Sequence, residues 1–93
     1  MIRSFRDGET AKVFRRRFSR RLPTDIQGTA LRKLRMLTNA ANVTDLRSPP
    51  ANRLEKLSGD REGQYAIRIN DQWRICFSWR EGDAYDVEIT DYH

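Results

Sequence analysis

Apolar residues recur at three- and four-residue spacing in the N-terminal half of the chain and at alternate positions in the C-terminal half. The first spacing is typical of a helix with one buried face, and strict alternation is typical of a strand with one buried face. Pro49 and Pro50 separate the two halves, because proline interrupts regular structure. The pattern predicts an α+β fold, with two N-terminal helices packed on one face of a small twisted antiparallel sheet.

The first helix is expected to begin after Asp7, whose carboxylate can cap the free backbone N–H groups of the first turn. Its expected buried stripe consists of Ala11, Phe14 and Phe18, which follow one another at helical spacing. Residues 1–5 precede this helix and are expected to form a short N-terminal edge strand.

The second helix is expected to begin with a capping box, in which Thr24 bonds forward to the backbone and Gln27 reaches back. The helix is expected to run to about Ala41. Its apolar residues follow at near four-residue spacing and define one buried face: Ile26, Ala30, Leu34, Leu37 and Ala41.

Three antiparallel strands are expected in the C-terminal half, each with one apolar and one polar face. The helices can cover the apolar face and leave the polar face open. The residues expected on the apolar face are Tyr65, Ile67, Ile69, Trp73, Ile75, Phe77, Trp79, Tyr85, Val87 and Ile89.

The register of these strands follows from burial, because a slip of one residue would turn every apolar side chain to the open face. A three-residue connection, residues 70–72, places Arg68 directly opposite Arg74. Like charges in this arrangement are unfavourable, so we expect an anion to compensate them, either a carboxylate such as Glu88 or a bound phosphate. Extending the register pairs Arg74 with Thr90 and Phe77 with Val87.

Composition makes the chain one small domain, residues 1–93, with a net charge of +5. The positive charge is concentrated near the N-terminus, where it favours a polyanion as partner: RNA, DNA or an acidic protein. The residues of this cationic cluster are Arg15, Arg16, Arg17, Arg20, Arg21, Arg32, Lys33 and Arg35.

Cys76 and His93 are the single cysteine and the single histidine of the chain. One cysteine cannot form an intramolecular disulfide, and the pair cannot supply a Cys/His metal site. Cys76 lies in an expected strand, where a small buried hydrophobe is a more ordinary role than a nucleophile. We find no signal peptide and no apolar run of about 20 residues, and we expect a cytoplasmic protein without a membrane partner.

The last three residues, Asp91, Tyr92 and His93, are candidates for chemistry on an anion such as RNA. Imidazole titrates near neutral pH and is therefore well suited to proton transfer. A frayed tail is the alternative, because chain ends are often disordered unless other contacts hold them. Strict alternation would direct Asp91 and His93 to the opposite face from Tyr92, so the tail must twist if all three are to meet.

Four segments of the chain together resemble the HigB-type toxins of bacterial toxin–antitoxin modules, which are members of the RelE/ParE superfamily. The segments are residues 1–5, residues 59–63, residues 67–77 and the terminal Asp91-Tyr92-His93. The resemblance implies the RelE/ParE fold and ribosome-dependent cleavage of mRNA. It also implies neutralisation by a HigA-type helix-turn-helix antitoxin, through which alone the toxin would meet operator DNA.

The resemblance further implies a catalytic set of His93, Asp91, Tyr92 and Arg74. The reaction needs a base for the ribose 2′-hydroxyl, an acid for the leaving oxygen and cations for the phosphoryl oxygens, but no metal or cofactor. We expect Arg74 and Arg68 to bind the phosphate, His93 to transfer a proton, Asp91 to orient His93 and Tyr92 to stack on a base or donate a hydrogen bond.

The chain departs from the family pattern in one segment. Many members have His-Pro-Leu-Lys-Gly where this chain has Glu55-Lys56-Leu57-Ser58-Gly59, so that Glu55 replaces a histidine and Ser58 a lysine. Glu55 could serve as base and Lys56 could replace the missing cation, so both are candidate substrate-binding residues with Arg61 and Arg68.

Two other functions remain open from the sequence. A ParE-like toxin would inhibit DNA gyrase by binding and would not need the terminal histidine. A basic adaptor would bind nucleic acid without cutting it. The antitoxin is expected to mask either the cationic helical surface or the open sheet face, and the sequence does not distinguish the two.

Overall fold

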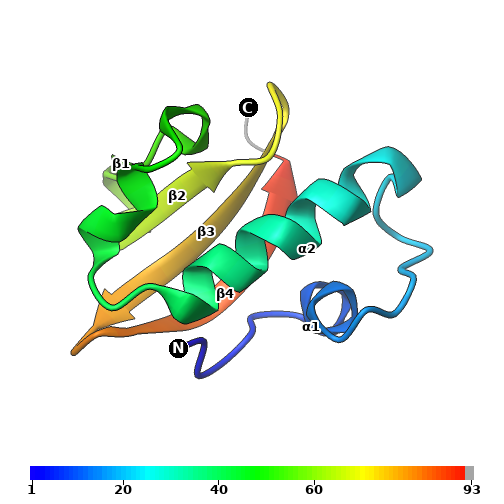
Figure 1. Ribbon diagram of the computed structural model, residues 1–93, viewed down its shortest axis with the longest axis horizontal. Helices are drawn as coiled ribbons and strands as arrows, with labels where there is room; N and C mark the ends of the chain where they lie inside the picture. Colours follow the sequence, from blue (N-terminus) through cyan, green and yellow to red (C-terminus); the bar gives the residue numbers. More distant parts are fainter. Residues whose placement is uncertain (92–93) are drawn as a thin grey trace.

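The computed structural model describes residues 1–91 as two helices packed against a four-stranded antiparallel sheet with strand order β1-β2-β3-β4 (Figure 1). The predicted fold class is confirmed. The helices are α1 (Gly8–Phe14) and α2 (Thr24–Asn39), and the strands are β1 (Glu55–Lys56), β2 (Gln64–Arg68), β3 (Trp73–Arg80) and β4 (Asp83–Asp91). Short 3-10 helices η1 (Val43–Arg47), η2 (Pro50–Asn52) and η3 (Gly59–Arg61) lie between α2 and β2.

Helix α1 begins where the sequence predicts, because the carboxylate of Asp7 accepts a hydrogen bond of 2.7 Å from the backbone N–H of Thr10. It ends earlier than expected. Arg16 has a φ of 61°, and the N–H groups of Arg16 and Arg17 bond back to the carbonyls of Val13 and Lys12, which is a Schellman ending. The prediction that Phe18 is a core residue is therefore wrong: its side chain lies beyond the helix and is 60% exposed.

Helix α2 buries Ile26, Ala30, Leu34 and Leu37 against the sheet, as predicted, but ends at Asn39 and leaves Ala41 exposed. The predicted capping box is wrong, since Pro23 is the N-cap residue and makes no side-chain cap. The amide of Gln27 instead accepts from the N–H of Ser19 at 3.0 Å and donates to the carbonyls of Ser19 at 2.8 Å and Leu22 at 3.0 Å. Gln27 thus fixes the loop between the helices.

The predicted register of β2 and β3 is confirmed, with Ile67 opposite Ile75 and Arg68 opposite Arg74. Strand β4 pairs Thr90 with Arg74 as predicted, but the ladder shifts by one residue between Cys76 and Ser78. At this bulge Asp86, with a φ of 52°, and Val87 share the position opposite Phe77, so Phe77 does not pair with Val87 alone as predicted.

The bulge reverses the alternation of β4 on its N-terminal side. Ala84 is fully buried there, and Tyr85 points to the opposite face, where its ring lies 4.2 Å from the guanidinium carbon of Arg80. The prediction that Tyr85 belongs to the apolar face is therefore wrong. The extra residue that changes this register has no signal in the hydrophobic pattern.

Residues 1–5 lie along the free edge of β4, but they form two isolated parallel bridges, Ile2 with Ala84 and Phe5 with Val87, and not a continuous strand. The carboxylate of Asp83 accepts a hydrogen bond of 3.0 Å from Arg3, which ties this segment to the start of β4. The segment therefore covers the edge that β4 would otherwise expose.

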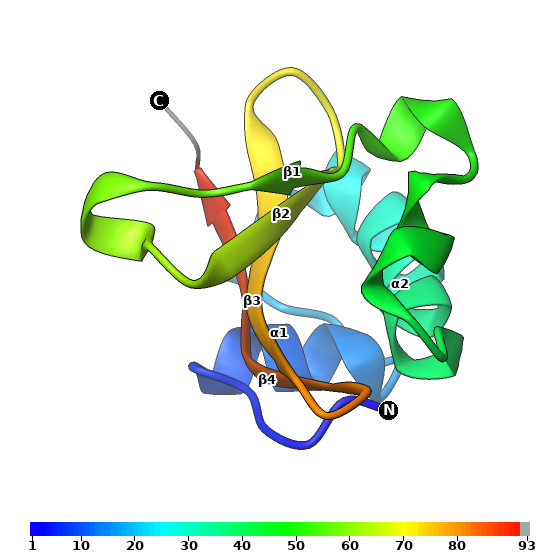
Figure 2. The same cartoon turned by 90° about the vertical axis from the view of Figure 1, so that its left-hand side faces the viewer.

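The sheet face away from α2 is partly covered by the segment that contains β1 and η3 (Figure 2). Leu57 from this segment packs with Ala66 and Cys76 in a second, small apolar cluster. The expectation of a wholly open polar face is therefore wrong, and this partly covered side is called the outer face below. No helix within residues 1–91 has the length and apolar character needed to cross a membrane.

Lys33 is the one member of the predicted cationic cluster that is buried, with 5% of its surface exposed. Its ammonium group donates to the buried side chain of Asn52, and burial is the main cause of its lowered pKa. Asn52 in turn donates to the carbonyl of Leu46 at 3.1 Å. Lys33 thus joins α2 to the 3-10 helices and does not contribute to the surface expected from the sequence.

Candidate active site

The opposed arginines lie at the end of the outer face, next to the turn that joins β2 and β3. The guanidinium of Arg68 forms an ion pair with Asp71, and that of Arg74 donates to the carbonyl of Asn70. Arg68 holds the pKa of Asp71 below its usual range. The compensating carboxylate expected from the sequence is thus Asp71, whose side chain is 98% exposed. It is not Glu88, which the sequence had suggested as an example.

The turn itself is fixed by Asn70, whose side-chain oxygen accepts hydrogen bonds from the N–H groups of Gln72 at 2.9 Å and Trp73 at 2.8 Å. Such Asx geometry is a common way to stabilise a tight turn. Because Arg68 and Arg74 are anchored by this same turn, their guanidinium groups keep a defined position. The Nε of Arg68 is buried without a hydrogen-bond partner in residues 1–91, so its terminal nitrogens make the polar contacts.

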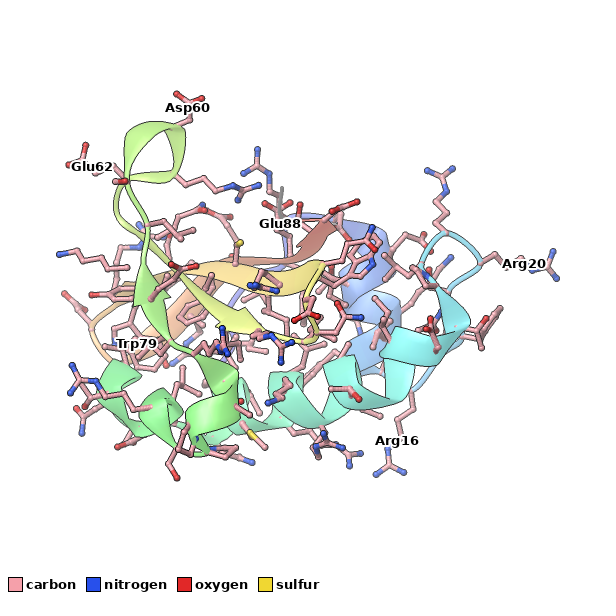
Figure 3. All side chains as sticks on the ribbon, turned by 90° about the horizontal axis from the view of Figure 1, so that it is seen from above. Arg16, Arg20, Asp60, Glu62, Trp79 and Glu88 are labelled. Atoms are coloured by element: carbon pink, nitrogen blue, oxygen red, sulfur yellow. The ribbon has the colours of Figure 1, made fainter. Side chains whose placement is uncertain are left out.

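A third arginine, Arg61, reaches from η3 across the middle of the outer face. It donates to Glu88 of β4 at 2.7 Å and to Gln64 of β2 at 3.0 Å, and therefore spans β3. Glu88 also lies 3.7 Å from Arg6 of the N-terminal segment. Figure 3 shows Glu88 on the side of the sheet away from α2, with Asp60 and Glu62 at the tip of the projecting η3 loop.

Cys76 lies in the row of side chains between Ala66 and Glu88 on the outer face. It is fully buried, and burial raises the pKa of its thiol to about 11. Since the thiolate is the nucleophilic form of cysteine, this residue is a poor nucleophile at neutral pH. The structure agrees with its interpretation as a small buried hydrophobe.

Glu55 and Lys56 point to opposite faces of the sheet. Glu55 pairs with Ala66 and lies on the outer face with the arginines. Lys56 pairs with Tyr65, which stacks on Phe77 at 6.1 Å in the core that faces α2. The structure therefore brings Glu55, but not Lys56, to the face that carries Arg61, Arg68 and Arg74.

Asp91 pairs with Trp73, which places it on the opposite face from Arg74 and Thr90, as strict alternation predicts. Its carboxylate accepts a hydrogen bond of 2.9 Å from Gln72, so the end of β4 lies beside the β2–β3 turn (Figure 1). Tyr92 and His93 lie outside the described residues, and their catalytic roles stay predictions.

The described part of the site offers guanidinium groups for an anion, and carboxylates and a backbone carbonyl hold these groups in place. Asp71, Asn70 and Arg6 belong to this arrangement but were not predicted from the sequence as site residues. The three-residue spacing of Arg68 and Asp71 across the predicted turn was the available signal. No comparable signal exists for Arg6, which lies 82 residues before Glu88 and meets it only because the N-terminal segment follows β4.

Comparisons with known proteins agree with the fold. The model of a family described as the RelE-like toxin of type II toxin-antitoxin system HigB matches residues 3–93. Toxin HigB-1 of Vibrio cholerae is 43% identical over 70 residues, which is 75% of this chain and 74% of that protein. Endoribonuclease HigB of Proteus vulgaris is 30% identical over 93 residues, which covers both proteins completely.

A similar solved structure is the YoeB-YefM complex from Staphylococcus aureus, with a TM-score of 0.61. The match covers 100% of this chain and 98% of the other at 14% identity, so it bears on the fold alone. The family resemblance carried by the outer-face and terminal motifs is confirmed by the family model and by the two relatives. This chain belongs to the HigB-like family of RelE-like toxins from type II toxin–antitoxin systems.

Proposed function

We propose that this chain is a ribosome-dependent endoribonuclease, which cleaves mRNA during translation and arrests growth until an antitoxin neutralises it. The observation that carries the proposal is the opposed pair Arg68 and Arg74, which the β2–β3 turn holds beside the end of β4. Two guanidinium forks so placed suit the oxygens of one phosphodiester. The relative named Endoribonuclease HigB, which this chain matches over its whole length, supports RNA cleavage as the activity.

In the proposed reaction the ribose 2′-oxygen attacks the adjacent phosphorus and the bond to the 5′-oxygen breaks. The products are a 2′,3′-cyclic phosphate and a new 5′-hydroxyl. Arg68 and Arg74 stabilise charge on the phosphoryl oxygens, and His93 protonates the leaving oxygen. Glu55, on the outer face, is the candidate general base that accepts the proton of the 2′-hydroxyl. Asp91 orients His93, and Tyr92 stacks on a nucleobase of the RNA.

Arg61 and Lys56 have smaller parts in this proposal. Glu88 and Gln64 already engage Arg61, so we assign it the placement of the η3 loop against the sheet, where the loop can meet substrate. Lys56 lies on the face of Tyr65, so substrate contact by Lys56 requires RNA to pass the edge of β1.

The cognate partner in this proposal is a HigA-type antitoxin with a helix-turn-helix domain, which carries the toxin to operator DNA. Membership of a toxin–antitoxin family supports an antitoxin as partner, and the solved structural neighbour is itself a complex. A short helix-turn-helix reading frame beside the gene would support this part of the proposal, and its absence would count against it.

The experiment is to map new mRNA 5′ ends after brief induction of wild type and of His93→Ala. We expect cuts within translated codons for wild type and none for the variant at equal protein level. Cuts that persist in His93→Ala, or that persist when translation is blocked, would refute the mechanism. Inhibition of purified gyrase without any mRNA cutting would favour the ParE-like alternative.

A further inference from the structure

The side of the molecule away from the candidate active site carries a groove along the exposed face of α2. It consists of two adjoining hollows of about 470 and 530 Å³, which share Gly28, Leu31 and Arg35. Phe18 and Met36 complete the apolar surface of this α2 groove. Gly28, Arg32 and Arg35 lie outside the buried stripe of α2, while Leu31 and Met36 are only partly buried against the edge of the core, so the chain leaves the groove uncovered.

Four arginines line the groove, and all of them are exposed: Arg16, Arg17, Arg32 and Arg35. Within residues 1–91 none of the four forms an ion pair, and no Asp or Glu lines either hollow. Figure 3 shows Arg16 projecting from the side of the molecule that carries α2, opposite Glu88. The charge of the groove is therefore complementary to an acidic partner.

Phe18 is presented to solvent by a loop that is held in place. Ser19 next to it is fully buried, and its hydroxyl donates to Glu9 at 2.7 Å while its backbone bonds to Gln27 on both sides. A large aromatic side chain in water loses the free energy of burial, yet the structure fixes the loop that displays it. Phenylalanine, methionine and arginine are all enriched in protein–protein interfaces, so a fixed, exposed Phe18 beside arginines suits a protein partner.

Gly28 gives a separate indication. Glycine is a poor residue for a helix interior, and a Cβ atom added here would meet nothing within 4 Å. Packing inside this chain therefore does not require glycine at this position. Because Gly28 lines both hollows, its missing side chain instead allows the backbone or side chain of a partner to approach α2 closely.

We propose that the α2 groove binds an acidic segment of the antitoxin, which places one apolar face on Phe18, Leu31 and Met36 and its carboxylates between the arginines. The proposal rests on the proposed function only in taking the antitoxin as the partner. Residues 28–39 span about 17 Å of helix, which matches roughly three turns of a bound helix. RNA would use the arginines but would gain little from an apolar floor at Gly28, so a protein segment fits the groove better.

The test is to titrate the purified cognate antitoxin into toxin variants by calorimetry at low and high salt. Phe18→Ser removes the exposed ring, Gly28→Leu fills the floor, and the double substitution Arg32→Glu with Arg35→Glu reverses the rim. Arg47→Glu, on the exposed surface of η1 outside the groove, is the matched charge control. We expect each groove variant to weaken binding by about tenfold or more, and Arg47→Glu to leave it unchanged.

Gly28→Leu keeps the test decisive, because leucine favours the helix and the variant is expected to melt no lower than wild type. Wild-type affinity in both Phe18→Ser and Gly28→Leu, or an antitoxin that does not bind wild type, would overturn the proposal. The proposal would also be overturned if the groove variants lost ribosomal mRNA cleavage but kept wild-type affinity for the antitoxin. That result would make the groove a ribosome contact. Calorimetry measures antitoxin binding and does not depend on RNA cleavage. A chain that binds the antitoxin through the groove but cuts no RNA would therefore refute the proposed function and leave the groove proposal intact.

Discussion

Arg68 and Arg74 lie directly opposite each other on β2 and β3, and the turn that joins these strands holds both side chains. The turn thus sets the register and also supplies the carboxylate and the carbonyl that balance the two charges. A sheet rarely gains stability from opposed arginines, so a structure that maintains them beside the end of β4 is suited to binding an anion there.

The first prediction concerns Asp71, the exposed partner of Arg68. Asp71→Asn should lower the melting temperature in dilute buffer, because the repulsion between Arg68 and Arg74 loses its compensating charge. Inorganic phosphate should then raise the melting temperature of this variant more than that of the control variant Asp60→Asn. Asp60 is also an exposed carboxylate, but it lies in η3. Equal phosphate shifts in the two variants, measured by thermal scans, would mean that the arginine pair does not bind phosphate.

The second prediction concerns Gly28. Gly28→Ala should raise the free energy of unfolding by about 0.5–1 kcal/mol, because alanine is the better helix former and its methyl group meets no neighbour. Urea denaturation provides the measurement, with Gly8→Ala in the first turn of α1 as a comparison at a site that also has open space. A destabilised Gly28→Ala variant would show that the helix itself requires glycine.

The third prediction concerns Asp83 and the stability of the fold in acid. Hydrogen bonds from Arg3 and from the amino terminus hold the pKa of Asp83 below its usual value of 3.8. A carboxyl with a lowered folded-state pKa contributes stability that is full above 3.8 and disappears as pH falls through the folded value. Asp83→Asn should therefore be less stable than wild type at neutral pH, and the difference should vanish in acid.

Urea denaturation at a series of pH values measures this difference for Asp83→Asn and for Asp60→Asn. The control should match wild type throughout, because Asp60 is exposed and projects from the η3 loop (Figure 3). A stability gap for Asp83→Asn that stays constant down to the acid limit would contradict the assigned cause.

The fourth prediction concerns Cys76. A pKa raised from 9.0 to about 11 reduces the thiolate fraction at neutral pH roughly 100-fold, and burial blocks access as well. Iodoacetamide should therefore label the unfolded chain at pH 8 and leave the folded chain almost unlabelled, as read by intact mass. Rapid labelling of the folded protein would show that the second apolar cluster around Leu57 opens.

The fold and the arginine pair were predictable because burial determines them. Apolar alternation fixes the β2–β3 register, and the same register sets Arg68 against Arg74. Helix ends and strand irregularities were less predictable, since the Schellman ending at Arg16 and the bulge at Asp86 use left-handed backbone at residues other than glycine. Neither irregularity has a clear local signal in the sequence. The early end of α1 explains why Phe18 was wrongly predicted in the core, and the bulge explains why Tyr85 was wrongly predicted on the apolar face.

The candidate site was predictable where it follows from strand alternation, as for Asp91 and Thr90. The two-residue strand β1 was not predicted, so the opposite orientations of Glu55 and Lys56 could not be inferred. Lys33 was also placed wrongly from the sequence. Its charge suggested an exposed residue, but it lies on the buried face of α2 and is therefore buried.

The most direct test of the central claim is single-turnover cleavage of mRNA on programmed ribosomes by wild type, Arg74→Gln and Arg80→Gln. Both substitutions remove a guanidinium from the same face of β3, but Arg80 lies at the far end, over Tyr85. We predict a loss of about 100-fold or more for Arg74→Gln and little change for Arg80→Gln, with similar melting temperatures. Equal cleavage rates for Arg74→Gln and wild type would contradict the proposal that the arginine pair stabilises the reacting phosphate.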